Sequence, residues 1–233
     1  MALPKINAFP KYKMNIPSTG KEVRFRPFLV KEEKILMMAM ESNDTAQMLD
    51  SIVDTLDACI EEGFDKKEAT TFDVEYMFTK LRAKSVGETA EVSVKCDECE
   101  EENEIVIDVD SIALEVPQLE KIIEIDDNIR VEVQWPSYRS ISRMNPDNNQ
   151  TDQLFAILRA CLVAVHTEDE RIDLVDVAAD EIQEFIESMH RSQFSKIQTF
   201  IESMPSLKHD VEFKCSKCEK DNSIELQGMQ SFF

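Results

Sequence analysis

The chain has 233 residues, of which 42% are hydrophobic and 31% are charged, and this is enough for one sizeable core or two small ones. Its formal net charge of −21 repels phosphate backbones, so we expect no direct nucleic-acid binding and a preference for basic partner surfaces. With only 4 glycines and neither glycine-rich phosphate-binding motif, the chain also gives no sign of a nucleotide-binding loop.

The sequence predicts no membrane span and no secretory signal. The longest apolar run near the start is Ile35 to Met40, which is far shorter than a membrane-spanning helix. The first residues, MALPKINAFPKYK, lack a hydrophobic signal region. We therefore expect a soluble intracellular protein, or an assembly component that is made in a cytoplasm.

Residues 1–30 are predicted to form an arm followed by a β-hairpin. Apolar and polar residues alternate from Tyr12 to Ile16 and again from Val23 to Phe25, and the turn sequence 17–20 (PSTG) separates the two runs. Basic residues gather in this segment of an otherwise acidic chain. They could be a solvated hairpin face, or a partner-binding surface with Arg24, Arg26 and Phe28 as candidate contacts.

A helical region is predicted over residues 31–90. The run from Lys31 to Met40 favours a helix, and a second run places a stripe of apolar residues, Cys59 among them, on one face. Cys59 is therefore expected to be a buried small hydrophobe. A third helix is predicted after Thr70, because Asp73 three residues later completes a capping box.

Two CxxC motifs, Cys96 with Cys99 and Cys215 with Cys218, carry the strongest chemical signal. Their flanks, VSVKCDECEEENEIVI and VEFKCSKCEKDNSIEL, align residue by residue, and each predicts a strand, a turn and a second strand. Two thiolate pairs at this spacing can together hold one tetrahedral metal ion. We predict one structural zinc per chain in a split zinc ribbon. Two reduced pairs, or a disulfide within each pair, are the alternatives.

One feature of the turns departs from the usual pattern. Such turns often carry glycine after the second cysteine, where a positive φ is easiest, but here Glu100 and Glu219 take that place.

The segment between the motifs is predicted to be mixed and then helical. Two strands are expected at 122–125 and 129–133 around the turn 126–128, and a short strand or loop at 172–175. A helix is expected from about residue 151, with an apolar face that includes Cys161 and Val165, and two further helices precede Pro205.

The overall prediction is an α+β fold with a helical body, an N-terminal β-hairpin and a discontinuous zinc ribbon formed by two CxxC hairpins. The expected division is 1–30 for the arm and hairpin, 31–90 for the helical region, 91–112 with 206–233 for the split ribbon, and 113–205 for the insertion.

We find no catalytic motif: the three histidines have no metalloprotease or triad spacing, and a four-sulfur zinc site leaves no open position for water. We therefore expect no enzyme and no small-molecule substrate.

Several long stretches are similar to one family. These are residues 16–20, Phe25 to Ser42, Phe72 to Glu88, and Phe194 to Cys218 with the terminal Phe232 and Phe233. In this order they resemble the baseplate hub subunits of T-even-type bacteriophages with contractile tails. The resemblance implies a non-enzymatic structural or assembly role, with other hub or tail assembly proteins as partners. It also implies a location in the virion tail baseplate, or in the host cytoplasm during assembly.

Phe232 and Phe233 form an apolar chain end, so they join Arg24, Arg26 and Phe28 as candidate partner contacts. Two other functions stay open from the residues alone. One is a zinc-ribbon accessory factor in transcription or translation, which the net charge disfavours. The other is a metal-dependent enzyme, for which no residue can be named.

Overall fold

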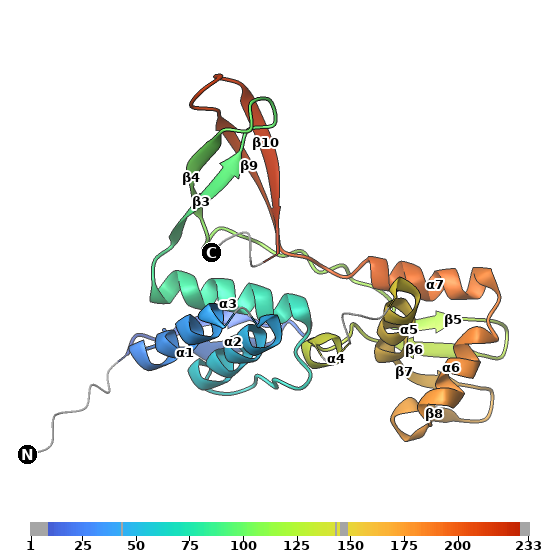
Figure 1. Ribbon diagram of the computed structural model, residues 1–233. Helices are drawn as coiled ribbons and strands as arrows, with labels where there is room; N and C mark the ends of the chain where they lie inside the picture. Colours follow the sequence, from blue (N-terminus) through green and yellow to red (C-terminus); the bar gives the residue numbers. More distant parts are fainter. Residues whose placement is uncertain (1–8, 43, 143, 145–148, 229–233) are drawn as a thin grey trace, which may run out of the picture. The chain divides into compact units, whose positions relative to one another are not determined.

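The computed structural model describes residues 9–42, 44–142, 144 and 149–228 (Figure 1). The fold is mixed α+β, as the sequence predicts, with an N-terminal hairpin and helices in both halves of the described chain. The chain divides into two compact units, Met1–Glu115 with Ser206–Phe233, and Val116–Pro205. The second unit is thus an insertion into the first, and the finer division into four parts stays a prediction.

The N-terminal hairpin pairs β1 (Tyr12–Asn15) with β2 (Glu22–Phe25) in antiparallel register, and this confirms the prediction. Met14, Val23 and Phe25 are buried, which places the alternating apolar residues on the core side. Gly20 has a φ of 70°, and its N–H donates to the Ile16 carbonyl to close the turn.

Three helices complete the N-terminal body: α1 (Val30–Glu41), α2 (Thr45–Cys59) and α3 (Thr71–Ser85). Asp44 caps α2 by accepting from the backbone N–H groups of Ala46 and Gln47. The predicted capping box of Thr70 and Asp73 is present at the start of α3. Asp73 Oδ1 also accepts from the Ser18 N–H at 2.8 Å, so the same buried carboxylate fixes the hairpin turn to the helix.

The hairpin and the helices share one core. Phe25 forms a β-bridge with Ile60, and the Arg26 N–H donates to the Cys59 carbonyl. Cys59 is buried, as the sequence predicts, and burial raises the pKa of its thiol to about 11. The largest fully buried side chains of this body lie on its strand and helices: Phe25, Leu56, Phe72, Met77 and Leu81.

The two CxxC motifs each join a pair of seven-residue strands. β3 (Thr89–Lys95) pairs with β4 (Glu102–Asp108), and β9 (Lys208–Lys214) pairs with β10 (Asp221–Gln227). The two hairpins lie side by side although residues 109–207 separate them in sequence (Figure 1). Buried residues from both hairpins form one cluster, together with the segment after β4: Ala90, Val94, Ile107, Val109, Ile112, Leu207, Val211 and Leu226.

The inserted unit contains a four-stranded antiparallel sheet of order β5-β6-β7-β8. Its elements are β5 (Ile122–Glu124), β6 (Arg130–Val133), α4 (Tyr138–Ser142), α5 (Gln150–Cys161), β7 (Leu162–His166), β8 (Arg171–Asp173), the 3-10 turn η1 (Leu174–Asp176), α6 (Ala179–Glu187) and α7 (Arg191–Glu202). Its buried core combines the sheet with α5, α6 and α7.

The helix predicted from about residue 151 extends further along the sequence than the helix in the structure. Val165 was expected on the helix face with Cys161, but α5 ends at Cys161 and Val165 lies in β7. The chain turns directly from helix to strand at Leu162, and β7 pairs on both sides inside the sheet. Cys161 itself is buried as expected, and burial raises the pKa of its thiol to about 12. No helix in the described part of the chain is long and apolar enough to cross a bilayer.

A buried ion pair joins the hairpin to α1. Glu32 is 4% exposed, accepts from Arg26 Nη2 at 2.9 Å, and accepts from the Leu29 N–H at 2.8 Å at the helix start. Burial opposes ionisation of Glu32, but the hydrogen bonds from Arg26, Leu29 and Lys31 outweigh it and hold the pKa below its ordinary value. Glu32 therefore stabilises the fold in its charged form.

We predict that Glu32→Gln lowers the free energy of unfolding by about 1–3 kcal/mol at pH 7, because it weakens a buried charge-assisted network. The folded-state pKa lies below the ordinary 4.5, so this contribution is complete above about pH 4.5 and is lost as the pH falls through the folded-state pKa. Urea unfolding at pH 7 and pH 3 measures it, with the exposed Glu33→Gln as control. An equal gap between the Glu32 variant and wild type at both pH values would contradict this account.

Candidate metal centre

The two CxxC turns have the same backbone structure. In the first, the Glu100 N–H donates to the Cys96 carbonyl and the Cys96 N–H donates to the Glu101 carbonyl, both at 2.9 Å. In the second, Glu219 and Lys220 make the equivalent bonds with Cys215 at 3.1 and 2.9 Å. The aligned sequences therefore fold into matching turns.

In both turns the residue after the second cysteine has the left-handed backbone conformation that usually favours glycine. Glu100 and Glu219 have φ values of 56° and 59°, and they are the positive-φ residues other than glycine in the described chain. For a residue with a Cβ this conformation costs about 1–2 kcal/mol. Two residues are held in this unfavourable conformation in the turns that carry the four cysteines.

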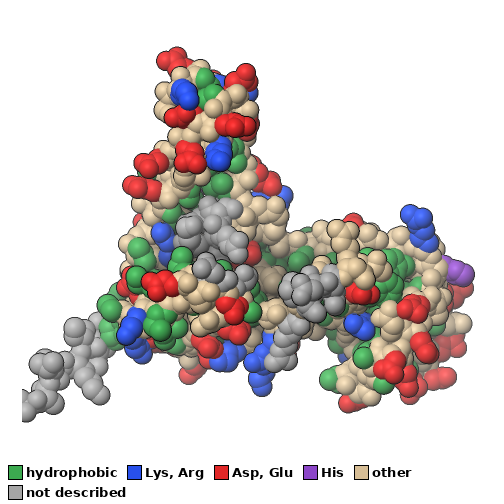
Figure 2. Space-filling model, viewed as in Figure 1, with side chains coloured by type: hydrophobic (Ala, Val, Ile, Leu, Met, Phe, Trp, Pro, Cys, Tyr) green, Lys and Arg blue, Asp and Glu red, His purple; other side chains and the backbone are tan. Residues whose placement is uncertain are grey.

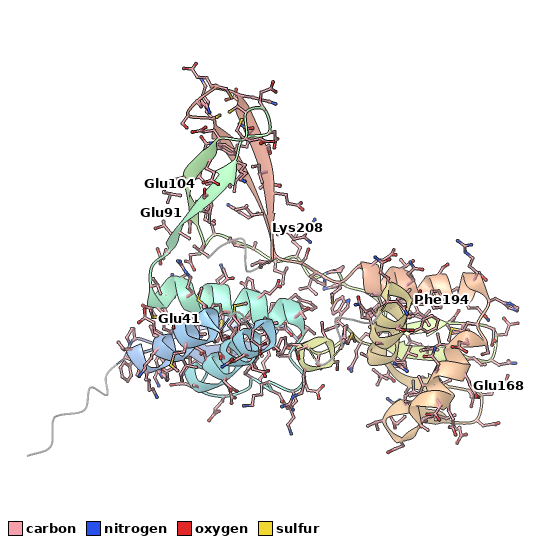
Figure 3. The ribbon with its side chains drawn as sticks, viewed as in Figure 1. Glu41, Glu91, Glu104, Glu168, Phe194 and Lys208 are labelled. Atoms are coloured by element: carbon pink, nitrogen blue, oxygen red, sulfur yellow. The ribbon has the colours of Figure 1, made fainter. Side chains whose placement is uncertain are left out.

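The four cysteine sulfurs form one cluster at the tip of the paired hairpins, where Figure 3 shows sulfur atoms in yellow. The Sγ atoms of Cys96, Cys99, Cys215 and Cys218 all lie within 4.8 Å of one another. Cys96 Sγ is 3.6 Å from Cys218 Sγ, and Cys99 Sγ is 3.6 Å from Cys215 Sγ. Four sulfurs at about 2.3 Å from a central ion would be separated by roughly 3.8 Å, so the spacing fits a tetrahedral metal.

The same distances bear on the disulfide alternative. A disulfide joins sulfurs at about 2.05 Å, whereas all six cysteines are free thiols in the structure. The close pairs also run between the motifs and not within them. The geometry brings the two motifs together around a common centre.

Two buried asparagines tie each turn to the other hairpin. Asn103 Oδ1 accepts from the Ser216 N–H at 2.8 Å, and its amide donates to the Glu101 carbonyl at 2.9 Å. Asn222 repeats this arrangement, accepting from the Asp97 N–H at 3.2 Å and donating to the Lys220 carbonyl at 2.9 Å. Each asparagine therefore satisfies a backbone N–H of the opposite turn, and the two hairpins are related by an approximate two-fold symmetry.

Asn103 and Asn222 occupy equivalent places in the aligned flanks of the two motifs, but the sequence alone predicted no role for them. The available signal was an identical amide residue at the same place in both repeats, four residues after the second cysteine. Their function depends on contacts between segments distant in sequence, which the alignment of the flanks does not report.

The electrostatic surroundings divide the cysteines into two types. Backbone N–H groups of Cys218 and Lys217 lower the pKa of Cys215 to about 6, and those of Cys99 and Glu98 lower the pKa of Cys96. For Cys99 the Glu101 N–H acts in the same direction, but burial and the neighbouring sulfurs prevail and raise its pKa to about 12. Unless a cation neutralises them, four adjacent thiolates repel one another.

Two ion pairs also link the turns. Lys217 contacts Glu101 at 2.6 Å, and Lys220 contacts Glu98 at 3.1 Å. These pairs are exposed, so water screens each of them and each contributes little to stability. Each pair joins a residue of the first motif's turn to a residue of the second, so the two pairs help to fix the position of one turn against the other.

The candidate partner contacts lie apart from this centre in the sequence and differ in exposure. Arg24 is exposed on β2, and Phe28 is half-buried. The Arg26 side chain is 19% exposed and is bound to Glu32, so much of its charge is already used inside the unit. Phe232 and Phe233 lie outside the described residues.

The comparison with protein families decides the broad identity. Residues 9–233 match the model of the T4 bacteriophage base plate protein family. The chain belongs to this family. No curated protein and no solved structure gives a significant match to the chain.

We predict that Asn103→Ala and Asn222→Ala each destabilise this baseplate protein by about 1 kcal/mol, because a part-buried hydrogen bond to an N–H of the opposite turn is lost. Since such outer contacts also orient ligands, metal affinity should fall about 10–100-fold. Chemical unfolding and competition with a chelator measure the two effects.

The exposed neighbour Ser223→Ala provides the matched control and should change neither quantity. Retention of full stability and metal affinity by both asparagine variants would show that the turns are positioned by other contacts.

Proposed function

We propose that this chain is a non-enzymatic structural or assembly subunit of the tail baseplate hub, held together by one structural zinc. The family match gives the setting, since members of the family are baseplate proteins. The observation that carries the molecular part is the convergence of four cysteines from two distant motifs to within 4.8 Å. The partners proposed are other hub or tail assembly proteins, and the proposed location is the virion tail baseplate, or the host cytoplasm during assembly.

The donor set supports zinc as the metal. Four thiolates in a tetrahedral arrangement are typical of structural zinc sites, which are coordinatively closed. When bound, the ion would supply charge neutralisation and a cross-link between the two hairpins, and its binding energy would become folding energy. Cys96, Cys99, Cys215 and Cys218 would be its ligands, with Asn103 and Asn222 fixing the turns that carry them.

The alternative role as a transcription or translation factor finds little support. A net charge of −21 disfavours contact with nucleic acid. The hairpin tip is not a basic surface either, because Lys217 and Lys220 are already paired with acidic residues of the first motif. The acidic chain is better suited to binding other proteins of an assembly than to binding nucleic acid.

We predict that Cys96→Ser and Cys215→Ser each abolish zinc binding and prevent baseplate completion, because the remaining ligands cannot close the site. The assay supplies variants of the chain to cells infected with a phage that lacks it, and sorts complete baseplates from intermediates by sedimentation and electron microscopy. Zinc is measured on the purified variants.

The chain offers its own matched controls. Cys59→Ala and Cys161→Ala remove buried thiols outside the cluster, so they should keep zinc and baseplate assembly and lose about 1 kcal/mol of stability. Zinc loss in these controls, or full assembly with the Cys96 and Cys215 variants, would contradict the proposal.

We further propose that Arg24, Arg26, Phe28, Phe232 and Phe233 contribute to the surface that meets the hub. Deletion of Phe232 and Phe233 should weaken assembly in the same assay while zinc content and melting temperature stay nearly unchanged, because apolar chain ends that bind a partner contribute little to the isolated fold. A truncated chain that unfolds would assign these residues to the chain's own core instead.

A further inference from the structure

Helix α1 presents an unusually apolar outer surface. Five of the ten exposed large hydrophobic side chains found in the described chain lie on these 12 residues: Val30, Ile35, Met37, Met38 and Met40, at 53–79% exposure. Only Glu32 and Ala39 of this helix are buried. In Figure 2, hydrophobic side chains show on the surface around α1. A clustered apolar surface of this kind marks a binding site more often than a free surface.

The exposed side chains have a chemical symmetry about the midpoint between Met37 and Met38. Counting outward from that point, Met37 corresponds to Met38, Ile35 to Met40, and Lys34 to Glu41. Lys34, Met37, Met38 and Glu41 have i, i+3, i+4 and i+7 spacing and so share one face of the helix, with Ile35 and Met40 at its two flanks. An antiparallel copy of the same helix, placed by a two-fold axis through this point, would therefore set methionines against methionines. It would also set each Lys34 against a Glu41. This is the self-complementarity that a two-fold interface requires, with each contact made twice.

The two end charges lack partners within the described chain. Lys34 and Glu41 are both exposed, and no ion pair among the described residues involves either one. Glu41 lies at the C-terminal end of α1, where Figure 3 labels it and where the helix dipole disfavours a negative charge. The last turn of α1 contains no basic residue to compensate. A lysine brought there from outside would neutralise this end.

We propose that α1 is a docking surface for α1 of a second copy of this chain, in antiparallel orientation, with Met37 and Met38 at the centre and two Lys34–Glu41 pairs at the ends. The charges of the outer face favour this occupant. Lys31, Glu33, Lys34 and Glu41 sum to zero, so the surface is locally neutral in a chain whose net charge of −21 otherwise repels a second copy.

The size of the surface sets the expected strength. A 12-residue helix is about 18 Å long. Two such helices bury less than the roughly 800 Å² per partner of a standard interface. The dimer should therefore be reversible and concentration-dependent, with dissociation in the micromolar range or weaker. This inference does not depend on the hub role or on zinc.

Sedimentation equilibrium of the full zinc-loaded chain, from about 1 to 500 μM, measures the dimer against this expected range. It is run at about 0.15 M salt, where repulsion between distant acidic surfaces is screened. Lys34→Glu and Glu41→Lys should each weaken dimerisation about tenfold or more, because both end pairs become like-charged. The double variant Lys34→Glu with Glu41→Lys should return to near the wild-type constant, since every reversed charge again meets its opposite.

Glu33→Lys is the matched control, because it changes the charge of the same helix as much as Glu41→Lys but has no charged residue at its symmetric position, Ser42. It should alter the dissociation constant by less than about threefold. The three substituted positions are exposed, so thermal melting should change only slightly in any variant. Glu41→Lys should raise it a little and Glu33→Lys should lower it a little, because cations suit the C-terminal end of a helix and anions its N-terminal end. A wild-type chain that stays monomeric throughout, or a double variant as weak as the single ones, would overturn the proposal and assign the surface to a different protein.

Discussion

The meeting of two hairpins around four sulfurs is the constraint on which the larger unit depends. Each hairpin alone is a two-stranded ribbon, and such ribbons are only marginally stable in water. Together they bury a shared apolar cluster and bring Cys96, Cys99, Cys215 and Cys218 within 4.8 Å of one another. The asparagine contacts and the ion pairs between the turns act in the same place, so metal, hydrogen bonds and packing all hold one junction.

This junction also explains how a complete unit can be inserted between the hairpins. The entropy cost of closing a loop grows slowly, by about 0.6 kcal/mol for each doubling of its length. Residues 116–205 form their own sheet and core, so they do not behave as a long flexible loop. The chain can leave the first hairpin, fold an independent unit, and return to the second hairpin at little cost to the metal centre.

The sequence predicted the parts of this fold that depend on local patterns. The N-terminal hairpin, the capping box at Thr70 and the clustering of the two CxxC motifs follow from alternation, capping chemistry and repeated flanks. The strand β7 was missed because Leu162–His166 continues an apolar run directly after α5, and only pairing with β6 and β8 makes it a strand. The roles of Asn103 and Glu32 were not predictable for the same reason, since their partners are supplied by other segments of the folded chain.

Zinc K-edge X-ray absorption on the purified chain tests the four-thiolate metal centre most directly. The predicted spectrum shows one zinc per chain with four sulfur ligands at about 2.3 Å, and no nitrogen or oxygen in the first coordination shell. A mixed shell, or a chain that folds fully with no metal bound, would contradict the four-thiolate site and remove the main support for the proposed architecture.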